Sequence, residues 1–390
     1  MKFIWNSTTP LSNCGYGIIT KELVGRLLDD GHEVTIATKH MSFGTYTWRG
    51  VKILDGLNFR YLNNMLERDG YDYLISLWDI WILYNKLHPP KDKWVGYIPI
   101  DTEWIARSYA EVITGNEKFV EENEGPGVTI AMSRHGVREL ESIGLQPLYA
   151  PIGVDTDVMK PSKQGRAKFR KACCFTDDNF VVGAVGLNYR DDRKGFIPLM
   201  RAFAIFVERH PEARLYLHTH AEGTKNNSVP YAQISEDLGL YDYMMFANQE
   251  MLDMDRIERK ELCGIYNSFD VFCLPTKGEG FGMPILEAQA CGVPVVTTNT
   301  TTGHELAGKT GWLIDVDDDD LRWMPTRTWR FEPKPSEILE CLEVAYSAWK
   351  HDSLKPMKQK ARQFARTYDW NVVWDKYWKP ILKHLEERLK

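Results

Sequence analysis

The chain has 390 residues, of which 43% are hydrophobic and 26% charged, and its formal net charge is −6. This composition is typical of a folded globular protein and excludes a disordered or fibrous one. The length predicts two domains of similar size, because a single core rarely serves so long a chain. The acidic balance argues against a broad nucleic-acid surface, although a nucleic-acid-modifying transferase remains open.

Seven cysteines are spread along the chain without a C-x-x-C pair. Their odd number and spacing indicate neither a disulfide framework nor a zinc site, and they suit a reducing compartment. The first residues turn polar too early for a signal peptide, and no apolar run reaches the length of a membrane span. We therefore expect a cytoplasmic protein with at most peripheral membrane contact.

The first half of the chain alternates short apolar runs with amphipathic stretches such as Ile18–Leu28 and Gly136–Ile143. Strands that are apolar on both faces and separated by helices indicate a mostly parallel sheet covered on both sides. The predicted strands are Phe3–Asn6, Glu33–Thr38, Tyr73–Leu77, Trp94–Ile98 and Val128–Met132. We assign these elements to a first domain over residues 1–160, which ends in the polar, turn-rich stretch from Lys160.

The same alternation restarts in a second domain, over residues 161–371. Helices are predicted at Gly195–Glu208 and Arg256–Tyr266, and a helical tail follows over Glu337–Arg366 and Val372–Leu389. The predicted strands are Val181–Val185, Leu215–His218, Val271–Pro275 and Val293–Thr298. Two successive doubly wound α/β units follow, each with a ligand crevice beyond the carboxyl ends of its strands.

The most informative stretch runs from Pro275 to Val296. A buried strand ends in a loop with three glycines in five positions, where backbone can approach a ligand closely. Pro284 then suits the first turn of a helix, and Gly292 suits its end. Free N–H groups and the positive end of the helix dipole would face the crevice, so a diphosphate is the natural occupant.

Two carboxylates flank this turn. Glu279 lies in the loop, and Glu287 lies about one turn inside the helix. So placed, they can accept hydrogen bonds from two separate sets of sugar hydroxyls. The alternative is a pair of solvated charges around an ordinary turn. The four aspartates at Asp317–Asp320 are interpreted as a solvated turn, and no metal site is predicted there.

The stretch resembles the E-x7-E signature of the retaining GT-B glycosyltransferases of family GT4, including the glycine and the V-P-V-V strand that follow it. The resemblance extends to the run Leu262–Pro275, to Ser133 with Pro151–Asp155, and to His304–Leu306 with Thr310–Leu313. It implies an α/β GT-B fold, in which two Rossmann-like domains face a central cleft. The N-terminal domain would bind the acceptor and the C-terminal domain the donor, with a C-terminal helix at about residues 372–390 crossing back to the first domain.

The resemblance also implies roles for the residues of the signature. Glu287 matches the glutamate that holds the ribose hydroxyls of the donor, and Glu279 matches the one beside the transferred sugar. The loop whose backbone contacts sugar hydroxyls and phosphate, with the helix start that follows it, corresponds to Gly280, Phe281, Gly282, Met283 and Pro284.

A basic loop is expected to neutralise the diphosphate. Lys194 matches the family's lysine there, and its positive charge would stabilise the leaving nucleotide. The family often has an arginine six residues earlier, where this sequence has Asn188. Arg190 or Arg193 could take the place of the family's arginine. The alternative for each is a solvated charge in a loop.

The first half contributes two further candidates. The turn with Gly15 and Gly17 resembles the family's first βα loop, which faces the diphosphate and the acceptor, although a plain turn explains it equally well. Asp101 stands where many members have a donor-contacting histidine. It could accept from sugar hydroxyls, bind the acceptor or simply cap a helix. His218 and His220 lie at the end of a predicted strand. They are interpreted either as groups that tune the site or as structural histidines.

Together these features predict a retaining glycosyltransferase that moves a sugar from a UDP- or GDP-sugar to an acceptor hydroxyl. The aromatic first half makes a glycan acceptor plausible. Neither a cofactor nor a metal is expected, because basic groups and a helix dipole neutralise the diphosphate. The alternatives are a nucleotide-sugar-binding protein without turnover, and a sugar phosphorylase or epimerase on the same scaffold.

Overall fold

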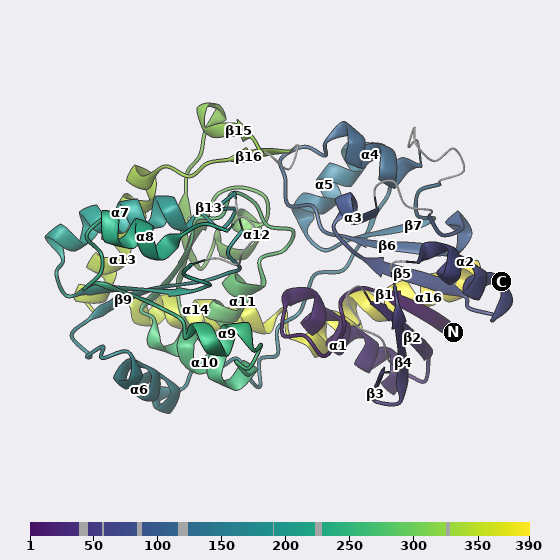
Figure 1. Cartoon of the computed structure of the whole chain (residues 1–390), viewed down its shortest axis with the longest axis horizontal. Helices are drawn as coiled ribbons and strands as arrows, with labels where there is room; N and C mark the ends of the chain where they lie inside the picture. Colours follow the sequence, from purple (N-terminus) through teal and green to yellow (C-terminus); the bar gives the residue numbers. More distant parts are fainter. Residues whose placement is uncertain are drawn as a thin grey trace. The chain divides into compact units, whose positions relative to one another are not determined.

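The computed structural model describes residues 1–38, 46–56, 58–83, 88–115, 124–189, 191–222, 228–324 and 328–390. It forms two compact units, Met1–Ile152 with Trp370–Lys390, and Gly153–Asp369 (Figure 1). The division falls before the turn-rich stretch that we expected to end the first domain at residue 160. That stretch packs with the second unit, because the Lys160 carbonyl accepts hydrogen bonds from Asn267 and Cys263.

Among its described residues, the first unit is built on an eight-stranded sheet of order β3-β4-β2-β1-β5-β6-β7-β8, in which only the β3–β4 pair is antiparallel. Its strands are β1 Lys2–Asn6, β2 Glu33–Thr38, β3 Tyr46–Trp48, β4 Val51–Asp55, β5 Tyr73–Leu77, β6 Trp94–Ile98, β7 Val128–Ala131 and β8 Leu148–Tyr149. Its helices are α1 Gly15–Asp29, α2 Phe59–Arg68, α3 Ile80–Leu83, the short 3₁₀ turn Lys91–Lys93, α4 Arg107–Thr114 and α5 Arg134–Ser142. The predicted parallel sheet is therefore present, with each of the five predicted strands in it.

The C-terminal segment returns to this first unit, as the family resemblance implied. It consists of α15 Trp370–Val373, a π-helical turn Trp374–Trp378 and α16 Lys379–Arg388, and Figure 1 shows α16 beside the strands of that unit. Trp378 is fully buried, with its ring 6.3 Å from that of Trp5 and 5.2 Å from that of Tyr97. The Tyr73 hydroxyl donates to the Leu385 carbonyl at 2.8 Å. Apolar burial thus fixes the tail against the sheet.

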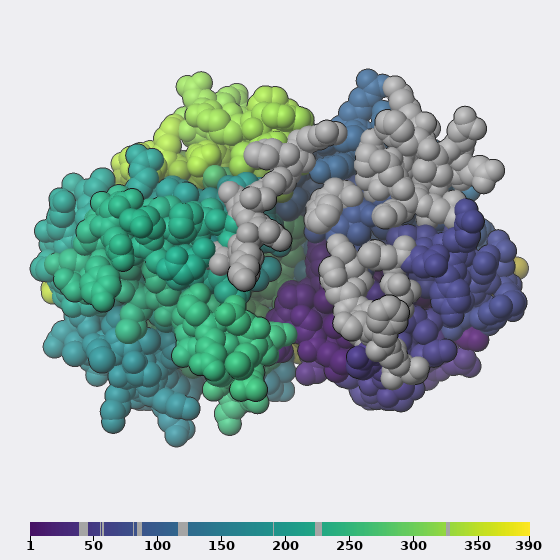
Figure 2. All heavy atoms as spheres, viewed as in Figure 1, coloured from purple at the N-terminus to yellow at the C-terminus, as the bar shows by residue number. Residues whose placement is uncertain are grey.

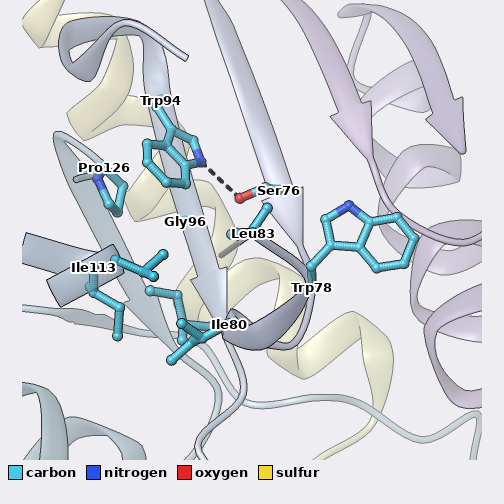
Figure 3. A pocket seen from close by; sticks show the side chains of 10 residues that line it. Ser76, Trp78, Ile80, Leu83, Trp94, Gly96, Ile113 and Pro126 are labelled. Carbon is cyan, nitrogen blue, oxygen red and sulfur yellow. Dashed lines mark hydrogen bonds between the residues drawn. The ribbon is translucent and has the colours of Figure 1, made fainter. Parts of the chain in front are cut away.

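A small apolar cavity lies inside the first unit (Figure 3). The indole N–H of Trp94 donates to Ser76 Oγ at 2.8 Å, so the polar atoms at its wall are paired with each other. Ile80, Leu83 and Ile113 supply apolar lining. We regard this cavity as part of the hydrophobic core, because its lining offers few groups that could orient a polar ligand.

The second unit has a six-stranded, fully parallel sheet of order β11-β10-β9-β12-β13-β14. Its strands are β9 Phe180–Val185, β10 Ala213–His218, β11 Met244–Phe246, β12 Val271–Leu274, β13 Val295–Thr298 and β14 Gly311–Ile314. Its helices are α6 Lys163–Ala172, α7 Phe196–Arg209, α8 Tyr231–Asp237, α9 Gln249–Asp253, α10 Arg259–Ser268, α11 Met283–Ala290, α12 Gly303–Ala307, α13 Pro335–Lys350 and α14 Leu354–Arg366. Both units are therefore Rossmann-like, as predicted.

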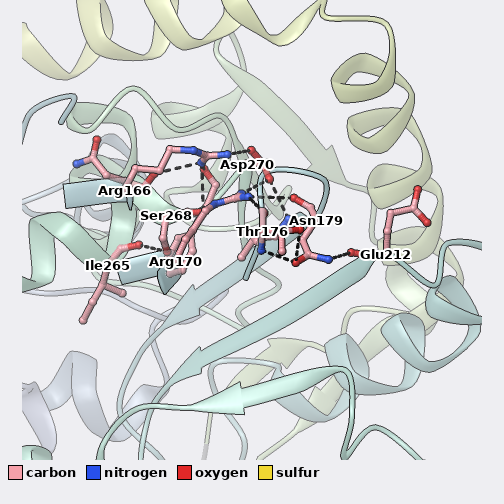
Figure 4. Close-up of polar contacts among 11 residues, drawn as sticks. Arg166, Arg170, Thr176, Asn179, Glu212, Ile265, Ser268 and Asp270 are labelled. Carbon is pink, nitrogen blue, oxygen red and sulfur yellow. Dashed lines mark hydrogen bonds and ion pairs between the residues drawn. The ribbon is translucent and has the colours of Figure 1, made fainter. Parts of the chain in front are cut away.

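A buried ion cluster anchors the link between α10 and β12 (Figure 4). Asp270 pairs with Arg166 at 2.8 Å and with Arg170 at 2.6 Å, and it accepts the Val181 N–H at 2.9 Å. Burial lowers the pKa of Arg170, while the charge of Asp270 opposes that shift. Moving the start of β12 would separate these charges, and an unpaired buried charge destabilises the fold. The cluster therefore fixes the start of β12, the strand that leads into the loop with Glu279.

An antiparallel hairpin, β15 Leu321–Trp323 with β16 Trp329–Phe331, was not predicted. It lies on the surface of the second unit (Figure 2), where Trp323 is 56% exposed. The aspartates before it form a 3₁₀ turn, in which Asp320 is buried and pairs with Lys334 at 3.0 Å. The interpretation of all four as solvated is therefore wrong for Asp320. No helix in the described ranges is long and apolar enough to cross a membrane.

Candidate functional site

The predicted donor residues of the second unit meet at the carboxyl edge of its sheet. The loops after β9 and β12 end on this edge because the two strands are parallel neighbours. They are joined directly, since Lys277 N donates to the Arg193 carbonyl at 2.8 Å and Thr276 Oγ1 donates to it at 3.1 Å. This contact brings the basic loop and the glycine-rich loop together, although they are far apart in sequence.

Lys194 and Glu279 form a buried ion pair at this edge. Lys194 Nζ lies 2.6 Å from Glu279 Oε1, and the two residues are 7% and 5% exposed. Burial alone would raise the pKa of Glu279, but the charges of Lys194 and Arg193 lower it overall, so the carboxylate is ionised at neutral pH. Gly186 leaves room for the lysine stem, because a Cβ there would lie 2.9 Å from Lys194 Cγ.

The glycine-rich loop turns into α11 through a left-handed residue. Gly282 has φ 97° at the N-cap of α11, and Pro284 lies in the first helical turn. Glycine adopts this conformation without the strain that a side chain would bring. The Phe281 side chain is 3% exposed, with its ring 6.0 Å from that of Tyr368. Phe281 therefore anchors the loop by its side chain, and a ligand contact at this residue would come from its backbone.

Glu287 lies inside α11 and is 4% exposed. Its Oε1 lies 2.5 Å from Arg259 Nη1, and its Oε2 accepts the Tyr266 hydroxyl at 2.8 Å. Burial opposes the charge on Arg259, but Glu287 raises the pKa of Arg259 overall. Neither Arg259 nor Tyr266 was among the residues predicted from the sequence. The signal that could have suggested them is their separation by seven residues, two helical turns, which places both on one face of a helix.

Of the basic-loop candidates, Asn188 has a clear structural role. Its amide donates to the carbonyls of His220 and Val229 and accepts the Val229 N–H. It thereby ties two neighbouring loops, and its contact with a donor stays a prediction. Arg193 donates to the Gly278 carbonyl at 3.1 Å and lies 3.9 Å from Glu279 Oε2. Arg190 lies outside the described residues.

Asp192 is a residue of this loop that the sequence analysis overlooked. It has φ 48°, is 4% exposed, and accepts the N–H groups of Phe196 and Ile197 at the start of α7. The Tyr231 hydroxyl also donates to it at 2.7 Å. Burial raises the pKa of Asp192 to about 6, although these hydrogen bonds oppose the shift. Asp192 thus fixes the turn that presents Lys194.

The first unit holds the remaining candidates at the carboxyl edge of its own sheet. Gly17 lies in α1, where a Cβ would come within 2.3 Å of the Ser12 carbonyl oxygen, so the turn before the helix requires glycine. Gly15 is the first residue of α1. Asp101 follows β6, and α4 begins at Arg107 with Ala106 at its N-cap, so Asp101 does not cap that helix.

His218 is a buried, neutral histidine. Burial, together with the charge of His220, lowers its pKa to about 4, and its Nδ1 lies 3.4 Å from the Tyr216 hydroxyl. His220 pairs with Asp253 at 3.1 Å. Within the described residues no group of three or more histidine, cysteine, aspartate or glutamate side chains is placed to hold a metal ion.

A family model for glycosyl transferases group 1 matches residues 179–322. The D-inositol 3-phosphate glycosyltransferase of Corynebacterium jeikeium is 33% identical over 193 residues, which are 44% of this chain and 44% of that protein. The GDP-mannose-dependent alpha-(1-6)-phosphatidylinositol monomannoside mannosyltransferase of Mycolicibacterium smegmatis is 32% identical over 185 residues, again 44% of each. The alignments thus span less than half the length of these relatives.

Solved structures resemble the chain over nearly its whole length. The sucrose-phosphate synthase from Thermosynechococcus elongatus has a TM-score of 0.72 at 14% identity and covers 99% of this chain and 100% of its own. Anabaena Alr3699/HepE, solved in complex with UDP-glucose, has a TM-score of 0.70 at 15% identity over 98% and 100%. Residues 179–322 thus match the model of the glycosyl transferases group 1, and the two Rossmann-like units have the GT-B fold of these solved structures.

Proposed function

We propose that this protein is a glycosyltransferase that moves a sugar from a nucleotide-diphosphate sugar to an acceptor hydroxyl with retention of configuration. The observation that carries the proposal is the buried pair of Lys194 and Glu279 beside the glycine-rich start of α11. An ammonium group and a helix N-terminus at one place suit a diphosphate, and an ionised carboxylate beside them suits sugar hydroxyls. The named activities of the relatives and the UDP-glucose bound by Anabaena Alr3699/HepE support this proposal.

In the proposed mechanism the donor diphosphate lies against Lys194, the backbone N–H groups of Gly280–Gly282 and the dipole of α11. As the bond from the anomeric carbon to the phosphate oxygen breaks, negative charge grows on the leaving nucleotide, and these groups stabilise it. The acceptor hydroxyl attacks the oxocarbenium-like sugar on the same face from which the leaving group departs. A phosphate oxygen takes the hydroxyl proton, so no protein base is needed. The acceptor attacks the sugar directly, so no protein nucleophile is needed either.

Glu279 and Glu287 orient the donor in this proposal. Glu279, held by Lys194, accepts hydrogen bonds from hydroxyls of the transferred sugar. Glu287, held by Arg259 and Tyr266, accepts them from the ribose. Since a lysine and a helix dipole supply the positive field, no divalent metal is required for the leaving group. Whether the donor nucleotide carries uracil or guanine is left to experiment.

The first unit is proposed to bind the acceptor. Asp101 and the turn with Gly15 and Gly17 lie at the carboxyl edge of its sheet, where ligands of such sheets bind. Trp104, three residues after Asp101, is 58% exposed, and an aromatic face of this kind suits a sugar ring. A glycan is therefore the acceptor class we favour. The seven free cysteines suit a cytoplasmic site of action.

The test is a transfer assay on the full chain with UDP-, GDP- and ADP-sugars, glycan acceptors and EDTA. We expect one nucleoside diphosphate to be released only when a suitable acceptor is present, and NMR to show that the product keeps the donor's anomeric configuration. Conversion of the donor without an acceptor would favour an epimerase. Tight donor binding without any turnover would favour a binding protein, and inversion would overturn the proposed mechanism.

A further inference from the structure

Each carboxylate oxygen of Glu287 is held by a different donor from α10. Arg259 Nη1 lies 2.5 Å from Oε1, and the Tyr266 hydroxyl donates to Oε2 at 2.8 Å. Tyr266 is fully buried, whereas 24% of the Arg259 side chain is exposed. The carboxylate is therefore fixed in one orientation, while part of its guanidinium partner is exposed.

The two donors are placed by one rigid helix. Arg259 and Tyr266 are two helical turns apart, so they project from the same face of α10. A capping box formed by Glu258 and Glu261 begins the helix. Near its end, Asn267 donates to the Lys160 carbonyl at 2.9 Å. With both ends of α10 fixed, the two donors approach Glu287 in a set geometry.

This arrangement limits what else Glu287 can bind. An ionised carboxylate has about four acceptor positions, two on each oxygen, and no donor. Arg259 and Tyr266 occupy one on each oxygen, which leaves one acceptor position on each. Two adjacent hydroxyl donors of a ligand would fit these two positions.

We propose that Arg259 is a positioning residue that gives this site its selectivity for a vicinal diol, and hence for ribonucleotides over 2′-deoxyribonucleotides. The inference rests on the proposed function, in which Glu287 faces the ribose of the donor. Arg259 acts through Glu287 and takes no part in breaking the glycosidic bond. Its removal therefore weakens the recognition of ribose more than that of the base or the diphosphate.

The experiment measures binding of UDP, 2′-deoxy-UDP, GDP and 2′-deoxy-GDP to the full chain by calorimetry. The variants are Arg259→Met, Arg259→Lys and Tyr266→Phe, and thermal unfolding records whether each is folded. Arg256→Met is the matched control. Arg256 is exposed and lies three residues before Arg259, and its substitution removes the same charge. In the wild type we expect the ribonucleotide to bind at least about tenfold more tightly than its deoxy form, since a hydrogen bond to a charged group is lost.

For Arg259→Met we expect the ratio of the two affinities to fall to within about twofold of one, with Arg259→Lys and Tyr266→Phe between this value and the wild type. Arg256→Met should keep the wild-type ratio. If Arg259→Met does not fold, the lysine and phenylalanine variants decide the question. Wild-type ratios in the folded variants, or a wild type that does not distinguish the sugars, would overturn this inference and leave the proposed function standing. A wild type that binds none of the nucleotides would overturn the proposed function itself.

Discussion

The carboxyl edges of the two sheets are built from different chemistry. In the second unit, two buried ion pairs, Lys194 with Glu279 and Arg259 with Glu287, lie at or beside this edge. In the first unit, the described contacts at the same edge include the hydrogen bonds from Trp78 Nε1 to Asn6 Oδ1 at 2.6 Å and from the Tyr16 hydroxyl to Asp79 at 2.7 Å.

Buried charges destabilise a fold unless they are paired, and both pairs of the second unit meet this condition. In the proposed function, the second unit binds the charged part of the substrate, and the first unit recognises the acceptor.

The largest expected effect comes from Lys194→Met. It removes the cation nearest to Glu279 and leaves a buried carboxylate, so stability should fall by about 3–5 kcal/mol. Transfer should fall by about a hundredfold to a thousandfold, because the leaving nucleotide loses its stabilising charge. Urea unfolding and initial rates measure the two losses. The double variant Lys194→Met with Glu279→Gln should regain much of the stability but none of the rate, and a double variant as active as the wild type would contradict the account.

His218 tests whether water is excluded from the carboxyl edge of the sheet in the second unit. Its folded pKa of about 4 lies below its ordinary value of 6.5, so the unfolded chain binds the extra proton between these pH values. This histidine should therefore lower the stability by about 3 kcal/mol as the pH falls from 6.5 to 4. In His218→Asn that part of the pH dependence should vanish from the unfolding curves, whereas a substitution at the exposed His351 should preserve it. An unchanged profile in His218→Asn would show that water reaches this edge.

Gly282→Ala tests the turn that aims the loop at the ligand. A side chain at φ 97° is strained, and its Cβ would lie 3.1 Å from Ile285 Cδ1, so we expect a loss of about 1–3 kcal/mol in thermal unfolding. Gly264→Ala is the control. Gly264 lies in α10 with no atom closer than 3.8 Å to its Cβ position, so alanine there should be neutral or slightly stabilising. Equal effects at the two positions would show that the turn is not under conformational constraint.

The smallest expected effect concerns the first unit. Asp101→Asn should lower transfer by about tenfold, through loss of a charge-assisted hydrogen bond to the acceptor or the sugar. The affinity for the nucleoside diphosphate should stay within about twofold of wild type, because that ligand belongs to the second unit. Calorimetry with the nucleotide, beside initial rates, separates the two quantities. A large loss of nucleotide affinity in Asp101→Asn would contradict the assignment of nucleotide binding to the second unit alone.

Much of the fold could be predicted from periodicity alone. Buried strands such as β5 and β12 are short apolar runs bounded by polar turns, and that pattern survives in the sequence. The β15–β16 hairpin escaped because its strands are three residues long and carry arginines beside aromatic residues. The predicted boundary at residue 160 differs from the division after Ile152. Thr156, beyond that division, binds Asp369, and no local pattern reveals such a contact.

The site was predictable where glycine, proline and glutamate follow a fixed spacing, as from Glu279 to Glu287. The partners that hold those glutamates come from other segments. Arg259 reaches Glu287 from α10, and the contact of Lys194 with Glu279 depends on two loops meeting at the sheet edge. Such pairings follow from the order of the strands, which periodicity does not determine.

The central claim is that the second unit binds a nucleoside diphosphate through Glu287, and thermal unfolding tests it most directly. UDP, GDP, ADP and CMP would each be added with and without EDTA to the wild type and to Glu287→Ala. At a hundred times its dissociation constant, a ligand that binds only the folded state adds about 2.7 kcal/mol. We expect one nucleoside diphosphate to raise the melting temperature of the wild type, with or without EDTA, and to have no such effect on Glu287→Ala. No shift with any nucleotide, or an equal shift in both proteins, would contradict the account.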